Sequence, residues 1–221
     1  MEHFITFIIG ACLASFIITM TQRHLLQIGP LTTRSLCDHC KHPLAWWQLV
    51  PLVGFTIQGG RCHWCRQRID PWSSRCELIC GTWLTLYSPS DLIEWLACLV
   101  VLSSLLTMAT TDWYACWINP LTLIGLIPLP MIVLVPFSFT NLWAYLLVTC
   151  LLLLVALFSH GIGQGDVEWL VLVLVLCGWR CYWQTVLIGC GLAFTSPKLW
   201  RHQRLPFLPY LSLGLLVSII I

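Results

Sequence analysis

The sequence predicts an all-α polytopic membrane protein with about eight transmembrane helices and a cytoplasmic zinc-binding cysteine loop. Three observations lead to this class: a very apolar composition, long apolar runs, and charges that are gathered between the runs. Hydrophobic residues make up 58% of the 221 residues and charged residues only 9%. An average soluble domain is about a quarter charged, so this chain cannot cover a globule that faces water on all sides. The composition also excludes a disordered protein and a nucleic-acid-binding protein, which needs a basic face.

The apolar runs are long enough to be membrane spans, because a transmembrane helix needs about 20 apolar residues. Eight segments are candidates, of which the second, sixth and seventh are short. They are residues 4–20, 76–88, 92–110, 118–136, 141–159, 167–179, 181–195 and 206–221. The sixth and seventh meet at Trp179-Arg180-Cys181. A six-span arrangement in which this pair forms one re-entrant hairpin is therefore the alternative.

The basic residues indicate the orientation. Seven of the 11 Lys and Arg residues lie between Arg23 and Arg75, three lie between Lys198 and Arg204, and Arg180 stands apart. With eight spans and an outer N-terminus, all but Arg180 fall on the cytoplasmic side, as the positive-inside rule requires. Arg23 follows the first apolar run, unlike the basic residues of a signal peptide, so this run is predicted to be a retained anchor. The expected organisation is a first transmembrane helix (1–20), a cytoplasmic loop (21–75) and a multi-span membrane domain (76–221).

Two CxxC pairs lie in the predicted cytoplasmic loop, Cys37 with Cys40 and Cys62 with Cys65. Two such pairs supply the four thiolates of a tetrahedral zinc site. The reducing side of the membrane disfavours two structural disulfides. We therefore expect a structural zinc ion on these four cysteines, with another thiolate-bound metal or a redox role as the alternative. Three nearby histidines are possible substitute ligands: His39, His42 and His63.

Two of the nine acidic residues, Asp112 and Asp166, lie at the cytoplasmic ends of apolar helices. An ionisable residue at such a position is costly and is a functional candidate by default. Asp166 closes a stretch in which Gly161, Gly163 and Gly165 alternate with other residues. These glycines leave the backbone bare, so that an extended peptide can approach the carboxylate closely. A glycine-rich turn with Asp166 as a helix N-cap is the structural alternative.

Two carboxylates that face one compartment suggest an aspartyl pair. Close carboxylates share a proton, so that the ionised acid takes a proton from water and the protonated acid donates to the scissile carbonyl. An ion- or metal-coupled transporter using the same two aspartates is the alternative function. It is disfavoured because both acids lie at one membrane face and no repeat relates two halves of the chain. A non-catalytic membrane scaffold stabilised by zinc is a further alternative, but it does not explain Asp166 and its neighbouring glycines.

The whole sequence resembles the type IV prepilin leader peptidases, which are GxGD aspartic proteases, including those of competence systems. The motifs that carry the resemblance are Gly10 to Phe16 with Arg23, Arg34-Ser35-Leu-Cys37-Asp-His-Cys40, Gly60-Arg61-Cys62-His-Trp-Cys65, Asp112 with Ile118-Asn119-Pro120, Gly163-Gln-Gly165-Asp166, and Pro206 to Gly214. Four departures from the usual pattern are present. Ala14 replaces a usual glycine, and Glu168 replaces a frequent lysine. Trp72-Ser73-Ser74 stands where the family has an aromatic-proline segment, and Asn119-Pro120 inverts the usual position of the proline.

The resemblance implies a multi-pass enzyme of the bacterial plasma membrane with its active site facing the cytoplasm. Asp112 and Asp166 are then the catalytic pair, and prepilin or pseudopilin leaders are the substrates. Many members also methylate the new N-terminus with S-adenosylmethionine, which would be a second cofactor beside zinc. Glu77 keeps the spacing of a family glutamate and is the residue we associate with methyl transfer. The lipid bilayer is an expected partner and nucleic acid is not.

Overall fold

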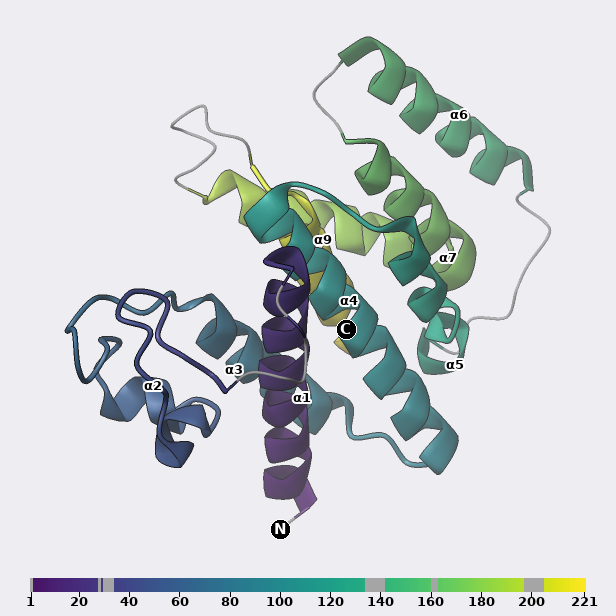
Figure 1. The fold of residues 1–221 in the computed structure, drawn as a ribbon. Coiled ribbons are helices and arrows are strands. Elements are labelled where there is room, and N and C mark those ends of the chain that lie inside the picture. Colours follow the sequence, from purple (N-terminus) through teal and green to yellow (C-terminus); the bar gives the residue numbers. More distant parts are fainter. Residues whose placement is uncertain (1, 28, 30–33, 134–141, 160–162, 197–204) are drawn as a thin grey trace. The chain divides into compact units, whose positions relative to one another are not determined.

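The computed structural model describes residues 2–27, 29, 34–133, 142–159, 163–196 and 205–221. In these ranges the regular elements are helices, apart from two isolated β-bridges. The predicted all-α class is thereby confirmed for the described part of the chain (Figure 1). The chain divides into two compact units, residues 1–89 and 90–221. We describe each unit by itself.

Unit 1 is built on two helices, α1 (Glu2–Leu25) and α3 (Trp72–Tyr87), which pack against each other in opposite directions. Glycines allow the close approach. A Cβ atom on Gly10 would lie 2.6 Å from the Cys80 carbonyl oxygen, and one on Gly81 would lie 2.9 Å from the Phe7 carbonyl oxygen. Small residues at a helix crossing let backbones meet in this way in apolar surroundings.

The segment between α1 and α3 forms the polar part of unit 1. It contains a short 3₁₀ helix, η1 (Trp46–Leu49), and one turn of α-helix, α2 (Val53–Ile57). Two β-bridges, Leu36 to Pro43 and Arg61 to Arg68, close the two cysteine-bearing turns. This irregular segment therefore depends on side-chain contacts more than on secondary structure.

Unit 2 contains α4 (Leu92–Ala115), η2 (Pro120–Leu126), α5 (Leu129–Val133), α6 (Leu142–Ser159), α7 (Gln164–Phe194) and α9 (Leu208–Ile220). The most extensive packing joins α7 to α9, and α4 contacts η2, α5 and α9 (Figure 1). At the α7–α9 crossing, a Cβ on Gly214 would lie 2.9 Å from the backbone nitrogen of Gly189. The C-terminal helix is thus held tightly against the second half of α7.

Three described helices are long and apolar enough to cross a membrane: α1, α4 and α7. Shorter apolar helices cover Pro120–Val133, Tyr145–Val155 and Leu208–Ile220. The predicted second span, 76–88, corresponds to α3, which begins earlier at Trp72 and ends at Tyr87. Asp70 explains this start, because its carboxylate accepts a hydrogen bond from the Trp72 N–H at 3.0 Å.

Two predicted spans have a different shape in the structure. The predicted span 118–136 is not one continuous helix, because η2 and α5 are separate short elements and residues 134–141 lie outside the described residues. The Ser104 hydroxyl of α4 donates to the Thr122 carbonyl of η2. The predicted spans 167–179 and 181–195 are the two halves of α7, which is kinked at Gly178 (φ 75°). Glycine adopts this backbone conformation at little cost.

Replacement of Gly10 by Ala should destabilise unit 1 by about 1–3 kcal/mol, because the new Cβ overpacks a backbone carbonyl that cannot move alone. Gly191 is the matched control, because it is a helical glycine whose Cβ would have nothing within 4 Å. Thermal unfolding of the full chain in detergent measures both variants. The Gly191→Ala midpoint should stay at or above the parental value. Equal midpoints for Gly10→Ala and the parent would contradict the close α1–α3 crossing.

Candidate functional site

The two CxxC pairs form two turns of the same shape. In the first, the Lys41 N–H donates to the Cys37 carbonyl at 2.9 Å, and in the second the Arg66 N–H donates to the Cys62 carbonyl at 3.0 Å. Lys41 and Arg66 both adopt the left-handed conformation, with φ of 56° and 59°. This repeated turn places two thiols on one short loop, which is the arrangement of a zinc knuckle.

The four predicted ligands converge. The Sγ atoms of Cys37, Cys40, Cys62 and Cys65 all lie within 4.8 Å of one another. The Cys37–Cys65 and Cys40–Cys62 sulfur pairs are separated by 3.9 and 4.0 Å. A tetrahedral zinc ion with Zn–S bonds of about 2.3 Å places its sulfurs about 3.8 Å apart. The cluster therefore fits a four-thiolate zinc ion.

The nearby histidines have other contacts. The rings of His42 and Trp64 lie 4.1 Å apart, and His63 makes edge contacts with Trp47 and Trp64 at 6.4 and 5.6 Å. Because His42 follows the first cysteine turn and Trp64 lies in the second, their contact joins the two turns. Among the described residues, the metal-ligand cluster contains cysteines only.

Asp112 lies in the last turn of α4 and is only 7% exposed. Its Oδ2 accepts a hydrogen bond from the backbone N–H of Leu208, the first residue of α9, at 3.0 Å. The first N–H groups of a helix lack intrahelical partners, and the helix N-terminus carries a partial positive charge. The start of α9 therefore gives the buried Asp112 carboxylate both a donor and a favourable field.

Asp166 lies in the first turn of α7, and the N-cap of that helix is Gly163 rather than Asp166. Its Oδ1 is buried and has no hydrogen-bond partner among the described residues. Asp112 lies close enough for the charges of the two carboxylates to interact. The structure thus brings the two predicted acids together in unit 2, each beside a helix N-terminus.

The glycines that were predicted to leave room for an approaching substrate do not share one environment. Gly161 lies outside the described residues. A Cβ on Gly163 would lie 3.3 Å from the Asp166 Oδ2, so this glycine leaves room beside the carboxylate. A Cβ on Gly165 would lie 2.6 Å from the Cδ1 of Ile118. Gly165 therefore makes room for the chain that follows α4, a contact that the glycine spacing alone did not indicate.

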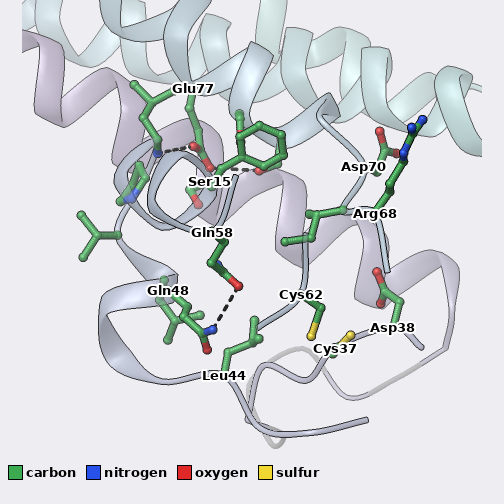
Figure 2. A pocket seen from close by; sticks show the side chains of 18 of the residues that line it. Ser15, Cys37, Asp38, Leu44, Gln48, Gln58, Cys62, Arg68, Asp70 and Glu77 are labelled. Carbon is green, nitrogen blue, oxygen red and sulfur yellow. Dashed lines mark hydrogen bonds between the residues drawn. The ribbon is translucent and has the colours of Figure 1, made fainter. Parts of the chain in front are cut away.

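Glu77 is buried in α3, with 5% of its surface exposed, and both carboxylate oxygens accept hydrogen bonds. The donors are the Ser73 hydroxyl at 3.0 Å and the Leu52 N–H at 2.8 Å. Glu77 lines a cavity of about 320 Å³ that lies entirely within unit 1 (Figure 2). The cavity was not predicted from the sequence, because nothing in the sequence pairs Leu52 with Glu77. The sequence signal for this place was an acidic residue, Glu77, inside the predicted span 76–88.

Comparisons with known proteins support one family. Residues 8–89 match the model of the Bacterial Peptidase A24 N-terminal domain. The chain is similar to three proteins named Prepilin leader peptidase/N-methyltransferase. The Klebsiella pneumoniae protein is 30% identical over 70% of this chain and 73% of its own length. The Bacillus subtilis (strain 168) protein is 26% identical over 97% and 92% of the two chains.

The third relative, from Burkholderia pseudomallei (strain K96243), is 31% identical over 82% of this chain. The match spans 65% of that relative's own length. No solved structure matches the chain.

The cysteine cluster leads to a prediction about metal content. The purified protein should contain about one zinc ion per chain, and Cys62→Ser should lose most of it, because three thiolates leave the site incomplete. Loss of metal should also make residues 34–70 more sensitive to protease, since metal binding is coupled to folding. Elemental analysis and limited proteolysis measure the two effects. Cys12→Ser, which changes an exposed cysteine of α1, is the control. Parental zinc content in Cys62→Ser would rule out the site.

Proposed function

Because the chain belongs to the prepilin leader peptidase/N-methyltransferase family, we propose that it is an intramembrane aspartic endopeptidase. Its substrates are type IV prepilin-like proteins, including pseudopilins and competence pseudopilins, from which it removes the leader peptide. The observation that carries the proposal is the convergence of Asp112 and Asp166 in unit 2. Burying two acids at one place in an apolar helical unit costs free energy. A catalytic mechanism in which the two acids share a proton explains why both are present.

The different surroundings of the two acids suggest different roles. The Leu208 N–H engages Asp112, and such a donor at a helix N-terminus favours the charged carboxylate. Asp166 has a buried oxygen with no partner among the described residues, which favours its protonated form. Asp112 then takes a proton from the attacking water, and Asp166 donates its proton to the scissile carbonyl oxygen. The titration belongs to the pair as a whole.

The proposed location is the bacterial plasma membrane, with the active site facing the cytoplasm. The three long apolar helices support a membrane protein, and eight crossings with an outer N-terminus satisfy the positive-inside rule. Of the two basic clusters behind this orientation, that between Lys198 and Arg204 falls on residues 197–204, outside the described ranges. In this arrangement the substrate's apolar helix stays in the bilayer while its scissile bond reaches the two aspartates.

We propose N-methylation of the new N-terminus as a second activity. It is supported by the names of the relatives and by unit 1, which corresponds to the matched N-terminal domain and contains the cysteine cluster and the cavity. Zinc would be held by the four cysteines and would stabilise their loop, since a four-thiolate site has no open position for chemistry. S-adenosylmethionine supplies the methyl group. The amine lone pair forms the new N–C bond as the S–C bond breaks, the sulfur keeps that electron pair, and the amine releases one proton to water.

Replacement of either catalytic acid should abolish cleavage. Asp112→Asn and Asp166→Asn each remove one proton carrier, so the cleavage rate should fall by a factor of about 10³ or more. The assay is cleavage of a co-expressed prepilin-like substrate, with membrane insertion checked in the same samples. Glu94→Gln is the control, because the Glu94 carboxylate accepts hydrogen bonds from Ser90 and has no proposed role in cleavage. An asparagine variant that cleaves at the parental rate would refute the aspartyl mechanism.

Whether Gly165 makes room for Ile118 or for the substrate can be tested. Gly165→Ala should slow cleavage by about tenfold, because the new Cβ clashes with the Ile118 side chain and displaces the start of α7. Ile118→Ala removes the Cδ1 and Cγ1 contacts and leaves only the Cβ, at 3.1 Å, which a shift of a few tenths of an ångström relieves, so the double variant should recover most of the rate. Initial rates of the two single variants and the double variant decide the question. If Gly165 instead leaves room for substrate, the double variant will stay as slow as Gly165→Ala.

A further inference from the structure

The cavity of unit 1 has the properties of a small-molecule site. Its volume of about 320 Å³ lies at the lower end of the usual range for ligand pockets. It is lined by both cysteine turns, the segment from η1 to α2, the start of α3, and Ser15 of α1. Figure 2 shows polar side chains pointing toward it from several of these elements. We propose that this cavity is the binding site for the methyl donor, of the S-adenosylmethionine class, and that Glu77 shapes it. The proposal deepens the N-methylation activity and rests on it.

The charge of the lining favours a cation. Among the described lining residues, the charged groups are the carboxylates of Asp38, Asp70 and Glu77 and the guanidinium of Arg68, and the imidazole of His39 also lines the cavity. S-adenosylmethionine carries a sulfonium and an ammonium group, which carboxylates attract, and one carboxylate that suits a guanidinium fork. Its adenine ring requires apolar surface, and Phe55 is an aromatic residue of the lining. A polyanionic nucleotide such as ATP has the same ring but the wrong charge.

The cavity shares a wall with the cysteine cluster. Cys37 and Cys62, one from each cysteine turn, belong to both. Leu36 and Arg68, which line the cavity, also take part in the β-bridges that close the two turns. A change that loosens the cysteine turns must therefore deform the cavity. The proposed metal site can therefore support the shape of the proposed methyl-donor site without taking part in the reaction.

Glu77 holds a strained turn at the cavity wall. Leu52 has φ 60° and ψ −45°, and the Val53 N–H donates to the Pro51 carbonyl at 2.6 Å. This is the geometry of the γ-turn with positive φ, which is rare and strained for a residue with a side chain. The Glu77 Oε2 accepts the N–H of this same Leu52. Strained backbone persists only where its surroundings enforce it, and the Glu77 carboxylate supplies that constraint.

Both oxygens of Glu77 are thus occupied by hydrogen bonds to Ser73 and Leu52. Each oxygen keeps a second lone pair, but the side chain is only 5% exposed and its two hydrogen bonds fix it between α3 and the Leu52 turn, so the structure assigns Glu77 a positioning role. Glutamine can reproduce both contacts, because its carbonyl accepts from Leu52 and its amide donates to the Ser73 hydroxyl. Alanine can reproduce neither. The two substitutions therefore distinguish positioning from proton transfer.

The experiment is calorimetric titration of the full-length, zinc-loaded protein in detergent with S-adenosylmethionine, followed by ATP. The parent should bind S-adenosylmethionine and show no comparable affinity for ATP. Glu77→Ala should weaken binding at least tenfold, and Glu77→Gln should stay within about threefold of the parent in both binding and methyl transfer. Equal affinity for ATP would overturn the proposed ligand class. Parental binding in Glu77→Ala, or loss of methyl transfer in Glu77→Gln with donor binding intact, would overturn the positioning role.

A second variant tests the cavity without touching Glu77. Ser15→Trp directs a large side chain from α1 toward the cavity and leaves the cysteine turns and α3 unchanged. Zinc content and leader cleavage should remain parental while S-adenosylmethionine binding falls at least tenfold. Parental binding in this variant would place the donor elsewhere. Cleavage is measured in every sample, so that normal cleavage without donor binding refutes this inference alone, whereas absent cleavage by the parent refutes the proposed peptidase.

Discussion

A carboxylate buried in an apolar helical unit needs a hydrogen-bond donor and a favourable electrostatic field. The N-terminus of α9 provides both for Asp112, because the Leu208 N–H donates to its Oδ2. The close packing of unit 2 positions the helices for this contact. Gly189 and Gly214 let α7 and α9 approach closely, and Gly165 lets the start of α7 meet Ile118 beyond the end of α4. Three segments that are distant in sequence therefore meet where the two aspartates lie. The cost of burying acids in an apolar environment explains why this meeting point is so closely packed.

Unit 1 solves a different problem, which is to order a long irregular segment. Its regular elements between α1 and α3 are only η1 and α2, too little to form a core of their own. Four cysteines, the ring contact of His42 with Trp64, and the two hydrogen bonds of Glu77 hold the segment instead. The same constraints leave a polar cavity beside the cysteine turns. The proposed metal site and the proposed ligand site are thus two consequences of one arrangement.

The sequence was sufficient to predict features that depend on local pattern. The CxxC spacing predicted a convergent cysteine cluster, which the structure confirms, and the apolar runs predicted the helices. Hydropathy did not reveal the break between η2 and α5, although Pro128, which lies between them, is a local signal that could have indicated it. It placed the break in α7 at Trp179-Arg180-Cys181, whereas the kink is at Gly178, where glycine permits a positive φ. The link between Glu77 and Leu52 could not be predicted, because it depends on how the polar segment folds back onto α3. The catalytic roles of Asp112 and Asp166 stay predictions that their proximity supports.

The central claim is that this chain cuts a prepilin-like substrate through its aspartate pair. The most direct measurement is the intact mass of such a substrate after incubation with the purified protein in detergent. We expect a product that begins directly after the glycine at the end of the basic leader, with its apolar helix intact. A substrate of unchanged mass, or one cut within its apolar helix, would contradict cleavage of the leader by the aspartate pair.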